Sequence, residues 1–139
     1  MKYHSASVGQ TKAIAAEFAR RLKMGDVVAF SGDLGAGKTQ FTAGAAAALG
    51  YAGPVTSPTF NILSVSPSQP PIAHFDMYRI ETERQLENTG FFDYAGGPYI
   101  TFIEWAENIG PFLPPSLYRV HIDYAGEGQR SIEIEEPQL

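Results

Sequence analysis

The sequence contains no cysteine among its 139 residues. Disulfide bonds and thiol chemistry are therefore excluded, and the composition fits a reducing compartment. No segment approaches the roughly 20 apolar residues of a membrane span, and the first residues lack the apolar core of a signal peptide. We therefore expect a cytoplasmic protein that makes no contact with a membrane.

Basic side chains are also few, because 15 acidic residues oppose 10 Lys and Arg residues and the net charge is −5. A nucleic-acid-binding surface needs positive charge, so this surface as a whole is not suited to bind one. Any RNA contact would need a local patch or a partner. The 3 histidines are too scattered to form a zinc-binding pattern.

The rest of the composition is that of an ordinary folded protein, with 44% hydrophobic and 12% aromatic residues. These fractions are far from those of a disordered chain. A length of 139 residues is typical of one globular domain. We therefore expect a single domain over residues 1–139.

The most informative segment reads Gly32-Asp33-Leu34-Gly35-Ala36-Gly37-Lys38-Thr39. It fits the pattern G-x-x-x-x-G-K-[ST] of phosphate-binding loops. The apolar residues 27–30 predict a buried strand before the loop, and the residues after it predict a helix. An ordinary glycine-rich turn is the alternative, but this strand-to-helix context favours phosphate binding.

The parts of the loop have separate roles in binding phosphate. Gly32, Gly35 and Gly37 accept positive φ angles and let backbone N–H groups approach phosphate oxygens. The helix that follows adds free N–H groups and the positive end of its dipole. We expect Lys38 to reach the β- and γ-phosphates and the Thr39 hydroxyl to bind Mg²⁺. The loop therefore predicts a site for a nucleoside triphosphate with magnesium.

A strand is predicted over residues 72–78, with Phe75 and Met77 on one face and polar side chains on the other. We therefore expect a row of polar side chains along one face of an otherwise buried strand. Asp76 is the candidate metal ligand in this row, and His74 is a structural hydrogen-bond partner.

A second strand is predicted over residues 100–103, and it places Glu104 at its end. Trp105 follows directly and is interpreted as a supporting residue of the site. Magnesium needs only one or two carboxylates beside phosphate oxygens. One of Asp76 and Glu104 can therefore bind the metal with Thr39 while the other orients the attacking water, and the sequence does not decide which.

The remaining patterns complete an α/β domain. Helices are expected over residues 9–23, 38–49 and 83–89, short strands over 61–65, 118–124 and 132–134, and loops over 91–99 and 111–115. The last two strands form a hairpin. The fold class is therefore a small phosphate-loop domain, with a mixed β-sheet flanked by helices and a C-terminal antiparallel hairpin.

Four motifs occur in order along the chain: GDLGAGKT at Gly32, SPTF at Ser57, HFDMYR at His74 and IEW at Ile103. In this combination, on so short a chain, the sequence resembles the bacterial TsaE family, also called YjeE. The resemblance covers nearly the whole chain. It implies a small ATPase needed to make threonylcarbamoyladenosine, the modified adenosine beside the anticodon of certain tRNAs.

The resemblance also implies protein partners. Members of this family work with TsaB, TsaD and TsaC, and TsaD transfers the threonylcarbamoyl group. The ATPase binds the TsaB–TsaD pair and hydrolyses ATP to permit repeated turnover. Contact with tRNA is then indirect, through the partners.

Site residues follow from matching the family's motifs position by position. The matched nucleotide positions are Thr11, Gly32, Asp33, Leu34, Gly35, Ala36, Gly37, Lys38, Thr39, Gln40, Trp105 and Arg130. The catalytic candidates are Lys38, Asp76 and Glu104, and the metal candidates are Thr39, Glu104 and Asp76. All cofactor expectations therefore concern ATP and Mg²⁺.

Two positions depart from the family's pattern. Ala106 stands where a proline commonly follows IEW, and Thr89 precedes Gly90 where an apolar residue is usual. We expect the first to loosen the loop after Glu104 and the second to disturb packing of the short helix. Neither position touches the proposed chemistry.

Three functions of different classes remain open at this level. The first is an ATP hydrolase that is slow alone, because no arginine finger is visible. The second is a nucleotide-gated binding module, in which ATP orders residues 57–60. The third is a small-molecule kinase, although no arginine-rich lid is evident and little chain remains for an acceptor pocket. A GTPase is disfavoured by the lack of N-K-x-D.

Overall fold

Seven strands and five helical segments make up the computed structural model, which describes residues 1–32, 37–53, 55 and 62–137. The strands are β1 (Lys2–Ser5), β2 (Val27–Gly32), β3 (Leu63–Ser66), β4 (Ile72–Asp76), β5 (Ile100–Glu104), β6 (Tyr118–Gly126) and β7 (Gln129–Glu135). The helices are α1 (Val8–Ala19), α2 (Lys38–Ala48), α3 (Glu83–Asn88), α4 (Phe91–Tyr94) and the 3₁₀ segment η1 (Ala106–Phe112).

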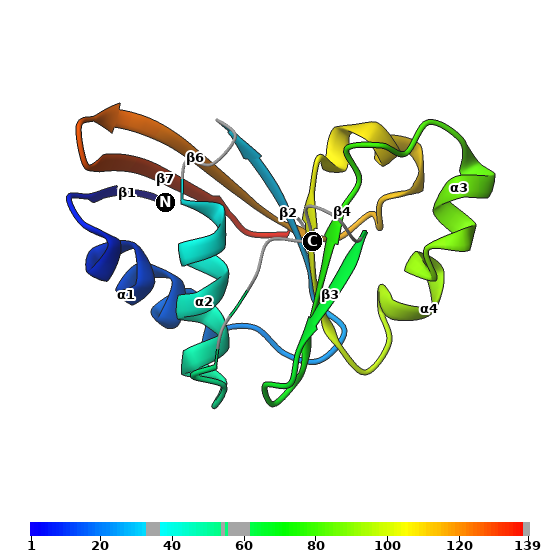
Figure 1. The fold of residues 1–139 in the computed structure, drawn as a ribbon, viewed down its shortest axis with the longest axis horizontal. Coiled ribbons are helices and arrows are strands. Elements are labelled where there is room, and N and C mark those ends of the chain that lie inside the picture. Colours follow the sequence, from blue (N-terminus) through cyan, green and yellow to red (C-terminus); the bar gives the residue numbers. More distant parts are fainter. Residues whose placement is uncertain (33–36, 54, 56–61, 138–139) are drawn as a thin grey trace.

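The strands form one mixed sheet in the order β1-β7-β6-β2-β5-β4-β3. Its centre is parallel, since β2 pairs in parallel with both β5 and β6, and β4 pairs in parallel with β5. Both edges are antiparallel, with β3 against β4 and β7 between β6 and β1. The predicted mixed sheet and the C-terminal hairpin β6–β7 are confirmed (Figure 1).

Helices α1 and α2 cover one face of the sheet (Figure 1). The core beneath them is rich in aromatic rings, and Phe30 of β2 is at its centre. Its ring lies 5.6 Å from Phe41 of α2 and 5.1 Å from Phe102 of β5, both edge-on. This packing fixes α2, and hence the helix N-terminus that follows the phosphate loop, against the end of β2.

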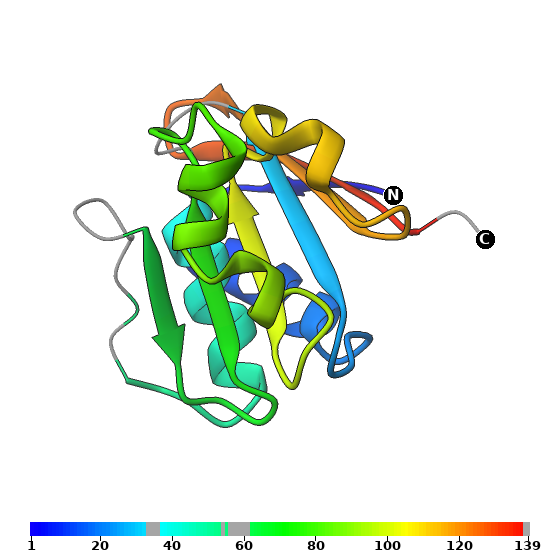
Figure 2. The same ribbon diagram turned by 90° about the vertical axis from the view of Figure 1, so that its right-hand side faces the viewer.

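Helices α3 and α4 and the segment η1 lie on the opposite face of the sheet (Figures 1 and 2). Phe75 of β4 contacts Phe91 of α4 edge-on, with ring centroids 5.5 Å apart. The central strands are therefore buried on both faces. In the predicted polar row of β4, His74 is therefore buried, with only 2% exposed, whereas Asp76 at the strand end is half-buried.

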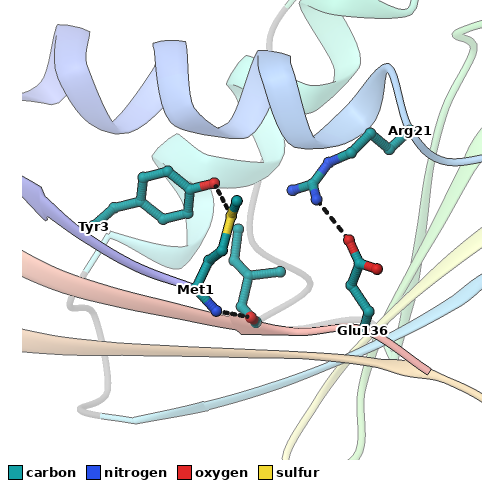
Figure 3. A network of polar contacts seen from close by, with 5 residues as sticks. Met1, Tyr3, Arg21 and Glu136 are labelled. Atoms are coloured by element: carbon teal, nitrogen blue, oxygen red, sulfur yellow. Dashed lines mark hydrogen bonds and ion pairs between the residues drawn. The ribbon is translucent and has the colours of Figure 1, made fainter. Parts of the chain in front are cut away.

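The N-terminal strand β1 was not predicted. It pairs with β7, and the Met1 ammonium donates to the Ile134 carbonyl oxygen at 2.8 Å. On the same part of the molecule, Arg21 forms a 2.8 Å ion pair with Glu136 (Figure 3). These contacts join the start of the chain and the end of the first helical region to the last strand.

Helix α1 begins as predicted but ends earlier than residue 23. Ser7 is its N-cap and accepts a hydrogen bond from the Gln10 N–H at 3.1 Å. In a capping box the Gln10 side chain would accept a hydrogen bond from the N–H of the N-cap residue. Here it accepts instead from the N–H of Ala6, one residue before the N-cap, at 2.6 Å. After Ala19 the chain continues in turns to Gly25, whose φ of 96° is left-handed.

Parts of the two segments predicted as loops are helical instead. Residues 91–94 of the predicted loop 91–99 form α4, and residues 111–112 of the predicted loop 111–115 are the end of η1. Thr89 joins α3 to α4, since its hydroxyl donates to the Leu86 carbonyl at 2.6 Å and accepts from the Phe91 N–H at 3.1 Å. Ala106 is buried in η1. Neither departure from the family's pattern therefore disturbs the local structure.

Candidate functional site

Lys38 is the first residue of α2 and is only 5% exposed. It follows Gly37, which caps the helix with a left-handed φ of 109°. Among the described residues Lys38 forms no ion pair, and the first turn of α2 contains no acidic residue. A buried cation at a helix N-terminus favours a bound anion, because an unpaired buried charge is costly.

The residues Asp33, Leu34, Gly35 and Ala36 lie outside the described part of the chain, as does the SPTF motif. The start of the loop is described. Gly32 ends β2 with a φ of 114°, and a Cβ there would lie 1.9 Å from the Ile122 carbonyl oxygen. Only glycine fits this position, because both the backbone angle and the neighbouring strand exclude a side chain.

Asp76 and Glu104 end two neighbouring parallel strands and are partners in the register of β4 and β5. The carboxyl ends of parallel strands meet at one edge of a sheet, where ligands of α/β proteins commonly bind. Glu104 is only 6% exposed, and Asp76 is half-buried. Lys38 is close enough to act on the pKa of both carboxyl groups. The structure therefore brings the three catalytic candidates together.

Each carboxylate has one oxygen engaged by a neighbouring group. Asp76 Oδ1 accepts a hydrogen bond from the Tyr78 N–H at 2.9 Å. Glu104 Oε2 lies 2.8 Å from His74 Nε2. The ring N–H is not aligned on this oxygen for a hydrogen bond, and both His74 ring nitrogens lack a hydrogen-bond partner among the described residues. The contact is therefore a close approach of the imidazole to the carboxylate without an aligned hydrogen bond.

The two carboxyl groups differ in acidity. Burial raises the pKa of Asp76, and the nearby Glu104 charge raises it further, while the Tyr78 hydrogen bond, His74 and Lys38 only partly oppose this. Burial also acts to raise the pKa of Glu104, but the contact with His74 and the charges of His74 and Lys38 outweigh it and leave that pKa below its usual value.

The donor set suits a magnesium ion held partly by a nucleotide. No group of three His, Cys, Asp or Glu side chains in the described ranges is arranged to hold a metal by itself. Magnesium does not need such a group, because one or two carboxylates and phosphate oxygens suffice. Within the described part of the chain, Asp76 and Glu104 each have one oxygen engaged by the protein, which leaves one oxygen apiece for this purpose.

Trp105 follows Glu104 with an unusual backbone. Its φ of 59° and ψ of 39° are left-handed, which is uncommon for a residue with a bulky side chain. Its ring lies 4.9 Å from that of Tyr78, which is 61% exposed. The residues that follow the two carboxylate-bearing strands, Tyr78 after β4 and Trp105 after β5, therefore contact each other through their aromatic rings.

Four of the residues that match nucleotide positions of the family line one pocket of about 220 Å³ beside the start of α2. They are Thr11, Gly37, Gln40 and Arg130, and the rest of the lining is Ala6, Ser7, Val8 and Gly128. Thr11 is buried and its hydroxyl lies 2.7 Å from that of Ser5. The Arg130 guanidinium lies over the Tyr124 ring at 4.5 Å and donates to the Gln129 carbonyl at 2.8 Å. The pocket therefore brings together four of the residues that were matched to nucleotide positions.

Comparisons with known proteins identify the family of this chain. Residues 5–132 match the family model described as threonylcarbamoyl adenosine biosynthesis protein TsaE. The chain therefore belongs to the TsaE family. The TsaE protein of Bacillus subtilis is 40% identical over 133 residues, which cover 95% of this chain and 83% of that protein. The Haemophilus influenzae TsaE is 38% identical over 109 residues, 78% of this chain and 68% of that protein.

The fold is also that of a solved TsaE-like structure. The crystal structure of Bacillus subtilis YdiB superposes with a TM-score of 0.81 at 34% identity, and the match covers 99% of this chain and 86% of that one. The resemblance inferred from the four motifs and the predicted fold class are thus confirmed. Among the described helices, none is long and apolar enough to cross a membrane.

One feature of this TsaE-family site was not predicted from the sequence. His74 was interpreted as a structural hydrogen-bond partner, but its ring instead approaches Glu104 on the next strand. The spacing of His74 and Asp76, two residues apart on a strand, does place both on one face. The register of β4 against β5, which no local pattern contains, decides that Glu104 is within reach.

Proposed function

We propose that this chain is a magnesium-dependent ATP hydrolase that supports formation of threonylcarbamoyladenosine in tRNA. The observation that carries the proposal is Lys38, a buried cation at the start of α2, next to two carboxylates on neighbouring strand ends. A buried cation beside two acidic groups is the arrangement that a triphosphate and its metal require.

Each side chain then has a defined task. Lys38 neutralises charge on the β- and γ-phosphates, and the pocket beside Arg130 takes the nucleoside. Thr39 with Asp76 or Glu104 would hold magnesium, which when bound neutralises phosphate charge. The other carboxylate orients water for in-line attack on the γ-phosphorus, so that the bond to ADP breaks as the new P–O bond forms.

The partners follow from family membership. We propose that the chain binds TsaB and TsaD, in a pathway that includes TsaC, and that hydrolysis allows these partners to act repeatedly. The net charge of −5 supports indirect rather than direct contact with tRNA. Turnover by the isolated chain is expected to be slow, because Arg130, which lines the pocket beside Gly37, has its guanidinium engaged by Tyr124 and Gln129.

The test is release of phosphate from ATP by the purified chain, alone and with TsaB and TsaD. Lys38→Ala should abolish hydrolysis, since it removes the buried cation. Lys23→Ala is the matched control, because Lys23 is exposed and lies outside the site. Full activity of Lys38→Ala would overturn the proposal, and a phosphorylated metabolite instead of free phosphate would indicate a kinase.

A second measurement separates hydrolysis from nucleotide gating. Glu104→Gln should bind ATP and the TsaB–TsaD pair but should support only a first round of tRNA modification. If this variant supports many rounds, ATP binding alone drives the partners and the hydrolytic part of the proposal fails.

A further inference from the structure

His74 is a buried polar side chain whose hydrogen bonds are not accounted for. It is only 2% exposed, and neither ring nitrogen has a hydrogen-bond partner among the described residues. Leaving a buried polar group unsatisfied costs about 1–3 kcal/mol. The register partners of His74 are Phe102 on β5 and Ser64 on β3. Neither satisfies the ring nitrogens, so packing alone does not explain an imidazole.

His74 lies close to the two carboxylates on the same face of the sheet. Along β4 it lies on the same face as Asp76, one step closer to the core. Its register partner on β5 is Phe102, whereas the partner of Asp76 is Glu104. The imidazole therefore lies beside Phe102 of the aromatic core, two residues along β4 from the carboxylate of Asp76.

The contact of His74 with Glu104 is short but incomplete. Nε2 lies 2.8 Å from Oε2, and yet the ring N–H is not directed at that oxygen. Hydrogen bonds at active sites are often poorly aligned without substrate and become better aligned in the bound complex. A small rotation of either side chain would complete this hydrogen bond.

We propose that His74 is a positioning residue that holds Glu104 through Oε2, so that Oε1 is left to bind the metal ion and Glu104, rather than Asp76, is the metal-binding carboxylate. A glutamate side chain has three rotatable bonds, and a carboxylate without this contact would populate several orientations. Residues that orient a metal-site carboxylate in this way typically contribute 10–100-fold to metal affinity or activity. The proposal rests on the ATP hydrolase function proposed above and deepens it.

Two substitutions of the same residue test the contact. In His74→Gln the amide nitrogen stands near the place of Nε2 and can still reach Glu104. In His74→Asn the amide stands near the place of Nδ1 and is too short to reach. Both variants remain polar, so they differ mainly in this contact. Phe102→Leu is the control for general loosening, because Phe102 is the register partner of His74, packs edge-on against Phe30 and carries no polar group that could hold Glu104.

The readouts are Mn²⁺ affinity in the presence of a non-hydrolysable ATP analogue, kcat and KM for ATP, and crystal structures of the metal-free variants. For His74→Asn we expect metal affinity and kcat to fall about 10–100-fold, while KM for ATP changes by less than about threefold. His74→Gln should recover most of the loss. The metal-free His74→Asn structure should show Glu104 in more than one orientation.

Several results would overturn the proposal. The first is a His74→Asn variant whose metal affinity and kcat equal those of the wild type. The second is an equal loss of metal affinity and kcat in the Asn and Gln variants. The third is the same loss of metal affinity in Phe102→Leu as in His74→Asn. An undisturbed Glu104 in the metal-free His74→Asn structure would do so as well. If the wild-type chain neither binds nor hydrolyses ATP, the proposed function fails, and the metal-free structures still decide whether His74 positions Glu104.

Discussion

Asp76 and Glu104 are register partners on β4 and β5, but the pKa values of their carboxyl groups are displaced in opposite directions. Burial dominates at Asp76 and raises its pKa. At Glu104 the contact with His74, together with the Lys38 charge, outweighs burial and lowers it. The ionised form of Asp76 therefore opposes folding of the ligand-free protein, whereas the ionised form of Glu104 favours it.

Neutral isosteres should therefore change stability in opposite directions at about pH 7. Asp76→Asn should stabilise the ligand-free protein by about 0.5 kcal/mol, a small gain because solvent screens a half-exposed charge. Glu104→Gln should destabilise it by about 1–2 kcal/mol, because it weakens the contact with His74. Denaturant unfolding of both variants and the wild type measures these differences.

The stability effects of Asp76 and Glu104 should also depend on pH in different ways. The Asp76 effect should disappear as the pH falls below the unfolded value of 3.8, where both states are protonated. The stability that Glu104 contributes is present above its unfolded value of 4.5 and is lost as the pH falls through its lower folded pKa. Equal shifts of both variants, or shifts that do not change with pH, would contradict the assignment.

Much of the fold could be predicted because its determinants are local. The apolar residues before Gly32 and the helix after Lys38 have their own periodicity, and the hairpin β6–β7 alternates strictly with a glycine-containing turn between its strands. Helix α2 was predicted to within one residue of its observed end at Ala48. In these segments local pattern and tertiary packing favour the same structure.

Other features depend on contacts between distant segments. Strand β1 is short, and it exists because β7, at the other end of the chain, pairs with it from Lys2 opposite Glu133 to Ser5 opposite Arg130. The contact of His74 with Glu104 depends on the register of two strands. The 3₁₀ segment after Trp105 depends on a left-handed residue that local propensity disfavours. No window of sequence contains these relationships.

Gly32 provides a second test of the site's construction. Gly32→Ala should destabilise the protein by about 3 kcal/mol or more, because the new Cβ would meet the Ile122 carbonyl of β6 and the φ angle is left-handed. It should also weaken ATP binding, since β2 could no longer lead into the loop along its present path.

Gly50→Ala is the control for backbone strain alone. Its φ of 96° is also left-handed, but nothing lies within 4 Å of the added methyl group. We expect a loss of about 1 kcal/mol and unchanged ATP binding. Denaturant unfolding and nucleotide titration of both variants separate strain from steric conflict, and equal effects would show that the β2–β6 contact is not decisive.

Arg130 should contribute to nucleotide affinity rather than to the chemical step. Its guanidinium lines the pocket beside Gly37 and is held over the Tyr124 ring. Arg130→Ala should raise the dissociation constant for ATP about tenfold, or about 1.4 kcal/mol, with kcat nearly unchanged. Arg119→Ala is the matched control, because Arg119 is an exposed arginine on β6 outside this pocket. Equal losses in the two variants would indicate a general charge effect.

Trp105 combines a strained backbone with a ring contact, and two substitutions separate them. Trp105→Ala and Trp105→Gly both remove the contact with Tyr78, but only glycine accepts a φ of 59° without strain. The glycine variant should therefore be more stable than the alanine variant by about 0.5–1 kcal/mol, the reverse of their order in most elements. Urea unfolding of the two variants measures this difference. If alanine is the more stable residue, the left-handed turn after Glu104 does not persist in solution, and Trp105 cannot then direct the chain away from the carboxylates as the structure describes.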